Sequence, residues 1–321
     1  MPIKKVSIIK NWDFPDLLRQ TPKRSGRWGD YQFTTDPIEK CDYAIVLNQP
    51  ASSVVVECPP DHVWAVMQEP PNEYHRWMHR GQRAFARIYT SDDTLRGGRF
   101  IQSQPALPWH VNKDYDYLKR CGIPEKTGSL SWVTSNLSIF SGHRRRLAFL
   151  EKLRQSQLPF DLFGKGFVFV EDKWDGLAPY RYSLAIENFK NPYYWSEKLA
   201  DCFLAWCMPI YYGCTRITEY FPSESMIVID VQDPQAIEKA GEAIQNRRWE
   251  KNLDAIAEAR KLVLEKYQFF PYLVNELNAD DQRSTTVTER QVLHPRKERL
   301  FSQDGMNIIL RYFAKWRTKK D

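Results

Sequence analysis

The sequence lacks any long apolar run. No stretch approaches the roughly 20 consecutive apolar residues that a membrane-spanning helix needs, so we predict that the chain is not an integral membrane protein. It also opens without the apolar segment of a secretory signal peptide, and its six cysteines show no CxxC spacing. We therefore expect reduced cysteines and a cytoplasmic location.

Signatures of nucleic-acid binding and of repeats are missing too. The sequence contains no zinc-finger, RNA-recognition or basic-zipper pattern and no low-complexity tract. Its net charge of +6 is modest for 321 residues and favours an acidic ligand or surface over nucleic acid. With 42% hydrophobic residues the composition is that of a folded protein, and the length favours two domains.

The first half of the chain alternates short apolar runs with polar, proline-rich connections. Several runs are continuous, as in buried parallel strands; strands are predicted at 6–9, 43–47, 53–57, 63–67 and 84–89. The stretch 102–124 has several prolines and little periodicity. We interpret it as a linker and place the domain boundary near residue 125.

The second half shows a clearer alternation of strands and helices. Strands are predicted at 130–134, 161–163, 182–187, 209–212 and 226–230, and helices at 144–155, 196–207, 234–247 and 252–267. This order indicates an α/β domain with a doubly wound parallel sheet.

Two of these helices begin with cations, which the helix dipole disfavours by roughly 0.3–1 kcal/mol unless an anion is present. Lys198 lies in one first turn, and Arg144, Arg145 and Arg146 lie in the other. Both helices follow strands of the predicted sheet, so their N-termini should meet at its carboxyl edge. A phosphate or diphosphate bound there would explain both groups, and a solvated basic turn is the alternative for either helix alone.

The run YRYSLAIENFKNPYYWSEKLADCFLAWCMPIYYGC, residues 180–214, resembles the signature of glycosyltransferase family 10, the α1,3/α1,4-fucosyltransferases. The similarity extends to residues 135–153 and 221–230. It implies a GT-B fold, with two Rossmann-like domains facing a central cleft, and inverting transfer from GDP-fucose to an acceptor glycan without a metal or other cofactor. Ser196 stands where threonine is usual, and Ile186 where an aromatic residue is common.

The resemblance also implies roles for individual residues of the second half. Glu197 matches the acid that holds the donor ribose, and Lys198 matches the lysine that binds its phosphates. Arg146 fits the family arginine best, although Arg144 or Arg145 could share the role. Asn188 and Tyr194 match positions that line the donor site.

The general base is expected in the first domain, opposite the donor, because an inverting transfer needs a carboxylate to take the proton of the acceptor hydroxyl. Glu69, at the end of the predicted strand 63–67, resembles the family's base, whereas Glu73 is interpreted as a surface carboxylate. The expected domains are thus an acceptor-binding domain at 1–125, a GDP-sugar domain at 126–285 and a C-terminal extension at 286–321.

Two possible metal motifs are set aside. Asp114 and Asp116 form a DxD pattern, but it lies in the linker region, so a solvated surface turn is the better interpretation. His75 and His79 lie four residues apart without the glutamate of a zinc-protease helix and without an evident third ligand, so we interpret them as a surface or partly packed pair.

The C-terminal segment 296–321 is basic, and as a helix it would have one apolar face. We favour a helix that packs back on the two domains over one that attaches the enzyme to the inner face of an anionic membrane. The apolar face would consist of Ile308, Ile309, Tyr312, Phe313 and Trp316.

Two other functions remain open at this stage. One is transfer of a different nucleotide sugar on the same fold. The other is a nucleotide- or lipid-headgroup-binding module without turnover. No nucleic-acid partner is expected.

Overall fold

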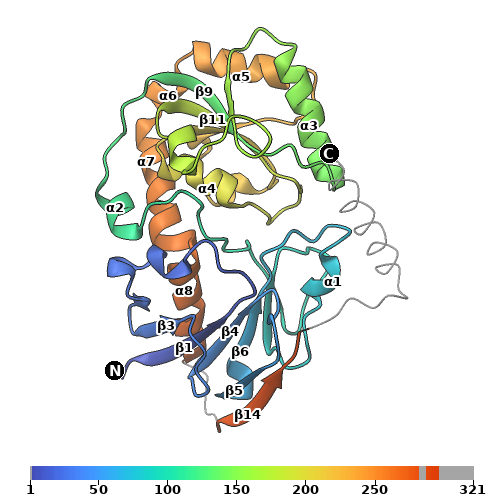
Figure 1. The fold of residues 1–321 in the computed structure, drawn as a ribbon, viewed down its shortest axis with the longest axis vertical. Coiled ribbons are helices and arrows are strands. Elements are labelled where there is room, and N and C mark those ends of the chain that lie inside the picture. Colours follow the sequence, from blue (N-terminus) through green and yellow to red (C-terminus); the bar gives the residue numbers. More distant parts are fainter. Residues whose placement is uncertain (1, 282–286, 296–321) are drawn as a thin grey trace. The chain divides into compact units, whose positions relative to one another are not determined.

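The computed structural model describes residues 2–281 and 287–295, which form two compact units. The first unit contains the chain up to Ala106 and resumes at Tyr272, while the second is the continuous segment Leu107–Pro271. Each unit is built on a mainly parallel sheet (Figure 1). The predicted α/β class with two Rossmann-like domains is thereby confirmed.

The first unit has a seven-stranded sheet in the order β2-β3-β1-β4-β6-β7-β8. All neighbours are parallel except β2 and β3. The central strands β4 and β6 are buried along their whole length, as their continuous apolar sequences predict. The strands are β1 Lys4–Ile9, β2 Arg27–Trp28, β3 Tyr31–Thr34, β4 Tyr43–Leu47, β6 Val63–Val66, β7 Arg87–Thr90 and β8 Phe100–Gln102.

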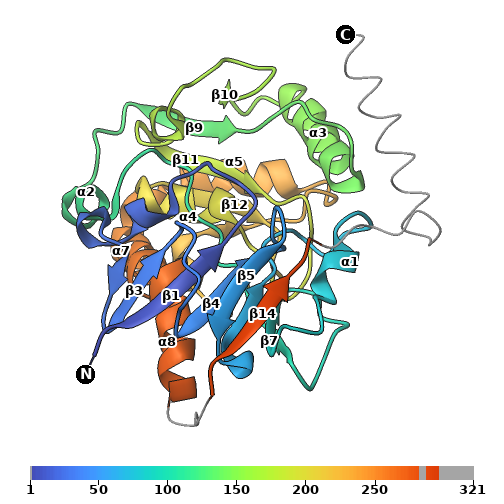
Figure 2. The same cartoon turned by 60° about the horizontal axis from the view of Figure 1, so that its bottom comes forward.

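A separate pair of strands completes the first unit. β5 (Val54–Cys58) was expected among the parallel strands, but it pairs antiparallel with β14 (Glu289–Leu293), and the two lie side by side in Figure 2. The helices of this unit are the 3₁₀ turns η1 Leu17–Gln20, η2 Pro22–Arg24 and η3 Pro60–His62, α1 Arg76–His79, and the part of α8 (Phe269–Asp281) that follows Pro271.

The second unit has a five-stranded sheet in the order β10-β9-β11-β12-β13, and all its strands are parallel. Its strands are β9 Gly128–Val133, β10 Asp161–Phe163, β11 Tyr180–Ile186, β12 Met208–Tyr212 and β13 Ile227–Val228. Its helices are α2 Tyr115–Arg120, α3 Ser141–Arg154, α4 Glu197–Leu204, α5 Ala236–Gln245, α6 Arg248–Lys251 and α7 Leu253–Leu262, with the π-helix η7 Val263–Tyr267 and the 3₁₀ turns η4 Lys173–Gly176, η5 Ile217–Glu219 and η6 Ser223–Ser225.

Helices α3 and α4 are fixed to this sheet by their apolar faces. α3 buries Phe149, Leu150 and Leu153 in the same core as Trp132 of β9. α4 buries the predicted stripe that includes Leu199, Cys202 and Phe203, but it ends three residues before the predicted end. The backbone at Trp206 is left-handed, with φ of 60°, which stops the helix.

The compact units differ from the expected domain boundaries. The first boundary falls after Ala106 instead of near 125, because the intervening segment is held by the second unit: the Asp201 carboxylate accepts a hydrogen bond from the N–H of His110 at 2.9 Å. The second falls at Tyr272 instead of 285, because α8 rejoins the first unit. There the Asn278 side chain accepts a hydrogen bond from the Tyr31 hydroxyl at 3.0 Å.

The expected C-terminal helix at 296–321, with its apolar residues from Ile308 to Trp316, lies outside the described residues. Within the two described ranges, no helix is both long enough and apolar enough to cross a bilayer.

Candidate functional site

The strand order of the second unit indicates where a ligand would bind. After β9 the chain crosses through α3 to β10 at one edge of the sheet, whereas after β11 it crosses through α4 to β12 on the other side. β9 and β11 are neighbours, so the sheet has its topological switch point between them. Open α/β sheets bind ligands beyond the carboxyl ends of the strands at such a point. The candidate site therefore consists of the segments that lead into α3 and α4.

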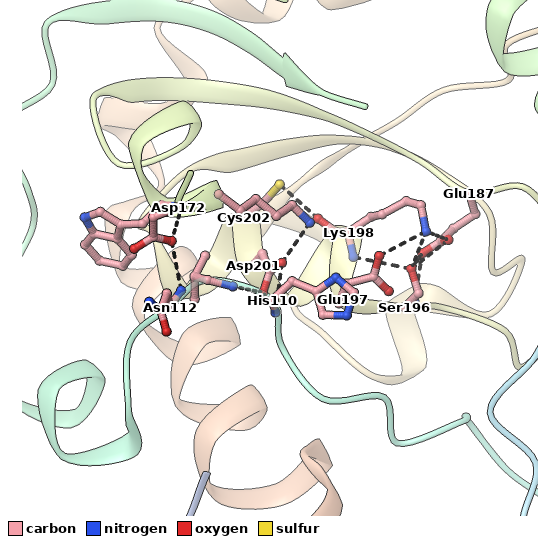
Figure 3. Close-up of polar contacts among 12 residues, drawn as sticks. His110, Asn112, Asp172, Glu187, Ser196, Glu197, Lys198, Asp201 and Cys202 are labelled. Atoms are coloured by element: carbon pink, nitrogen blue, oxygen red, sulfur yellow. Dashed lines mark hydrogen bonds and ion pairs between the residues drawn. The ribbon is translucent and has the colours of Figure 1, made fainter. Parts of the chain in front are cut away.

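The first turn of α4 contains a buried network of charges (Figure 3). Ser196 caps the helix: its Oγ accepts a hydrogen bond from the N–H of Lys198 at 3.3 Å and lies 2.7 Å from the Glu187 carboxylate, to which it donates. The Lys198 Nζ lies 3.3 Å from Glu187 Oε2 and 3.2 Å from Glu197 Oε1. Two carboxylates of the protein therefore compensate the charge of Lys198, so a cation in this first turn does not by itself require a bound anion.

The pKa values show how strongly this network is coupled. Burial opposes the charge on Lys198, but Glu187 and Glu197 outweigh it and raise the pKa of the lysine. Burial would likewise raise the pKa of Glu197, but Lys198, His110 and Lys173 together lower it well below its ordinary value. At Glu187 burial dominates and raises the pKa, although Lys198 offsets part of the effect. The lysine is thus charged, with an ionised Glu197 beside it.

The N-terminus of α3 approaches the end of β11 closely. A Cβ at Gly142 would lie 1.7 Å from the carbonyl oxygen of Asn188, so a larger residue would force the helix away from the strand. One turn later, Arg146 is only 4% exposed. Its Nη1 donates to Asn188 Oδ1 at 2.8 Å, and its Nη2 donates to the carbonyl of Ser135 at 3.0 Å. Arg146 therefore ties together the two segments that leave the switch point.

The three consecutive arginines have different surroundings. Arg144 is exposed and donates to the carbonyl of Ile139 at 3.0 Å, and Arg145 donates to the Tyr212 hydroxyl at 3.0 Å. Arg146 is the buried member of the three, and burial lowers its pKa while the nearby Glu187 raises it. Of the three arginines that the sequence left open, Arg146 is the one whose charge interacts with Glu187, as that of Lys198 also does.

His143 shows that the cations of the two helices lie close together. Burial, followed by the charges of Arg146 and Lys198, lowers the pKa of His143 to about 4. Both α3 and α4 therefore place a cation within electrostatic range of the same side chain. A neutral His143 adds no charge of its own to those of Arg146 and Lys198 at this edge.

A second polar network, which sequence reasoning missed, supports the other side of Glu197. The buried Asp201 of α4 accepts hydrogen bonds from Lys173 Nζ at 2.7 Å and from the N–H of His110 at 2.9 Å. Figure 3 shows the His110 ring beside Glu197. The only signal in the sequence is an acidic residue inside the apolar stripe of α4, and nothing near His110 indicates its partner.

The other predicted residues are distributed over both units. Tyr194 is 5% exposed, and its N–H donates to Asn191 Oδ1 at 2.7 Å, which orders the loop before α4. Arg146, Asn188, Tyr194, Glu197 and Lys198 thus all belong to the second unit. Glu69 belongs to the first unit, where its side chain is 48% exposed and its Oε2 lies 3.7 Å from His75 Nδ1.

The DxD pattern has a structural role that differs from the predicted surface turn. Asp114 is the N-cap of α2, and its Oδ1 accepts a hydrogen bond from the N–H of Tyr117 at 2.8 Å. Asp116 lies in the first turn of the same helix. Acidic residues at these two positions are typical of a helix start.

Comparison with known proteins agrees with this geometry. Cations at the switch point of a parallel sheet are an arrangement suited to binding the phosphates of a nucleotide. Residues 123–252 match the model of glycosyltransferase family 10 (fucosyltransferase), C-terminal domain. This part of the chain is therefore similar to glycosyltransferase family 10.

Two similar primate proteins are named as fucosyltransferases. A 4-galactosyl-N-acetylglucosaminide 3-alpha-L-fucosyltransferase of Pan troglodytes is 26% identical over 179 residues, which are 54% of this chain and 47% of the relative. A 3-galactosyl-N-acetylglucosaminide 4-alpha-L-fucosyltransferase of Pongo pygmaeus is also 26% identical over 179 residues, 54% of this chain and 45% of the relative. The chain thus spans about half the length of these relatives.

Solved structures show a more distant likeness. An α1,3-fucosyltransferase with GDP-fucose is 16% identical, with 84% of this chain and 93% of that chain covered and a TM-score of 0.45. The same class of enzyme with GDP gives a TM-score of 0.47 at 16% identity, with 83% and 92% covered.

Proposed function

We propose that this protein is an inverting glycosyltransferase that moves L-fucose from GDP-fucose to a hydroxyl group of an acceptor glycan. The observation that carries the proposal is that the family 10 match at 123–252 includes both cations at the switch point, Arg146 and Lys198. The two primate relatives are named as fucosyltransferases that form 3-alpha or 4-alpha linkages, so an α1,3 or α1,4 linkage is proposed here as well.

In this proposal the second unit binds the donor. The N-termini of α3 and α4 present backbone N–H groups and the positive ends of their dipoles to the diphosphate. Lys198 and Arg146 add full charges, which stabilise the departing GDP as the bond between the sugar and the phosphate breaks. Glu197, whose pKa is lowered by Lys198, His110 and Lys173 against the effect of burial, is ionised and can accept hydrogen bonds from the ribose hydroxyls.

The first unit supplies the general base. The Glu69 carboxylate takes the proton of the acceptor hydroxyl while the acceptor oxygen attacks the anomeric carbon, and GDP leaves from the opposite face. Attack on the face opposite the leaving group inverts the configuration at that carbon. An exposed carboxylate on a loop after a strand is accessible to an acceptor in this way.

We expect the purified protein to release GDP from GDP-fucose when a suitable glycan is present and to form a fucosylated product. The assay would use a panel of galactose- and N-acetylglucosamine-containing oligosaccharides, with product linkage determined by NMR. Turnover with a different nucleotide sugar and none with GDP-fucose would establish the rival transferase. GDP binding without transfer from any donor would instead indicate a binding module.

We expect the transfer rate to be unchanged by excess EDTA, because Lys198, Arg146 and two helix N-termini provide the positive charge that a divalent cation would otherwise supply. Initial rates with EDTA, Mg²⁺ and Mn²⁺ would be compared in the same buffer. Loss of activity in EDTA that Mn²⁺ restores would contradict this prediction and would direct attention to Asp114 and Asp116.

A further inference from the structure

His79 is a buried histidine that contacts the backbone of Glu69. It ends α1, is 0% exposed, and has its Nε2 2.9 Å from the carbonyl oxygen of Glu69 and its Nδ1 2.6 Å from Thr90 Oγ1. A carbonyl oxygen can only accept, so Nε2 carries the proton. Burial lowers the pKa of His79 to about 4, so the ring is neutral and Nδ1 accepts from the Thr90 hydroxyl.

Thr90 is itself held in place. Its Oγ1 accepts a hydrogen bond from the N–H of Asp92 at 3.0 Å, which directs the hydroxyl proton toward His79. Each hydrogen bond in this chain therefore has a fixed donor: the Asp92 N–H donates to Thr90, the Thr90 hydroxyl donates to His79, and His79 donates to the carbonyl of Glu69. The histidine has one tautomer and one orientation, set by the end of β7.

The other side of the Glu69 backbone is bound as well. The buried Asn48 follows β4 and has a left-handed backbone, with φ of 60°. Its Oδ1 accepts hydrogen bonds from the N–H groups of Gln68 at 2.8 Å and Glu69 at 3.2 Å. Pro70 and Pro71 then restrict the chain that follows. The backbone of Glu69 is thus held by buried side chains at both its N–H and its C=O, while its carboxylate remains exposed.

We propose that His79 is a positioning residue for Glu69, which keeps the carboxylate where an acceptor hydroxyl can reach it. The inference rests on the proposed function, in which Glu69 is the base. A catalytic group must be held within about 0.5 Å of its productive position, and a displacement of 1 Å can cost about 100-fold in rate. The His79 bond acts on the residue that carries the base, with no intervening residue.

Two substitutions remove the hydrogen bonds of His79 to Glu69 and to Thr90 one at a time. In His79→Gln the side-chain amide can reach the Nε2 position and still donate to the carbonyl of Glu69. In His79→Asn the shorter amide can accept from Thr90 but cannot reach that carbonyl. We expect His79→Asn to lower kcat about 10- to 100-fold at saturating donor and acceptor, with GDP affinity unchanged, and His79→Gln to retain most of the turnover.

The control is His62, another buried histidine of the first unit. Its Nδ1 lies 2.8 Å from the carbonyl oxygen of Asp42. His62 precedes β6, whereas Glu69 follows it, so the two residues lie at opposite ends of this strand. We expect His62→Gln to lower the thermal midpoint Tm without lowering kcat. Thr90→Val, which removes only the hydroxyl, provides a second test if His79→Asn does not fold, and we expect it to lower kcat less than His79→Asn.

The outcomes distinguish this inference from the proposed function. Normal turnover in His79→Asn, or equal losses in His79→Asn and His79→Gln that follow their losses in Tm, would overturn the positioning role. If Glu69→Gln loses turnover in the same assay, Glu69 remains the proposed base even when His79 has no positioning role. If Glu69→Gln also turns over normally, the base assignment itself is wrong.

Discussion

Replacing Lys198 with methionine should weaken the binding of GDP about 10- to 100-fold. Methionine keeps much of the aliphatic length but removes the charge, and a hydrogen bond to a charged group contributes about 1.5–3 kcal/mol, where 1.4 kcal/mol corresponds to a tenfold change in affinity. Calorimetric titration with GDP would measure the effect. Lys152→Met, on the exposed surface of the last turn of α3, should leave the affinity unchanged.

The loss of folding stability in Lys198→Met has to be separated from the loss of binding. The substitution removes the cation that contacts Glu187, which is 1% exposed, and removal of one partner of a buried pair typically costs about 3–5 kcal/mol. Combining it with Glu187→Gln removes both charges. We expect the double variant to recover most of the Tm but not the GDP affinity. Near-normal GDP affinity in a folded double variant would exclude Lys198 from the phosphate site.

Glu69→Gln should lower turnover by about 10²- to 10⁴-fold at saturating donor, because the amide keeps the size of the side chain but cannot accept the proton. GDP affinity should barely change, since Glu69 lies in the first unit and the proposed phosphate-binding cations lie in the second. Steady-state kinetics with saturating GDP-fucose, together with calorimetry on the same preparation, would measure both quantities.

The matched control for Glu69→Gln is Glu73→Gln in the same loop. Both carboxylates are exposed, so the comparison keeps the change in net charge constant. We expect near-normal turnover in Glu73→Gln. If Glu69→Gln retains its activity while Glu73→Gln loses it, the base is Glu73, and the proposed positioning by His79 then has no target.

The succession of strands and helices in the second unit could largely be anticipated from the sequence, because its strands are short apolar runs that alternate with helices. The elements that were missed depend on distant partners. β14 pairs with β5 across more than 230 residues, and a single exposed strand has no strong pattern of its own. α2 is a short helix in a proline-rich segment, and α8 has Pro271 in its first turn, where proline is compatible with a helix.

The charges of the site were easier to predict than their partners. Lys198 stood out because a cation at a helix N-terminus breaks a local rule, but nothing in the spacing identifies Glu187, eleven residues earlier, as the carboxylate beside it. The two meet because β11 and α4 are consecutive elements joined by a loop that returns to the strand end. Local pattern reveals which residues are unusual, whereas the path of the chain decides which of them meet.

The second unit is one uninterrupted stretch of chain inserted into the first. The family 10 match lies entirely within this insert. For the construction of chimeras, the insert can be exchanged as a single cassette with two junctions, near 106 and 271. An exchange of the first unit must instead carry both of its segments together, because Tyr31 and Arg87 from the early part of the chain bind Asn278 and Asp280 of α8. The unit with the proposed donor site can therefore be exchanged as one segment, whereas the unit that carries Glu69 has to be exchanged as two segments at once.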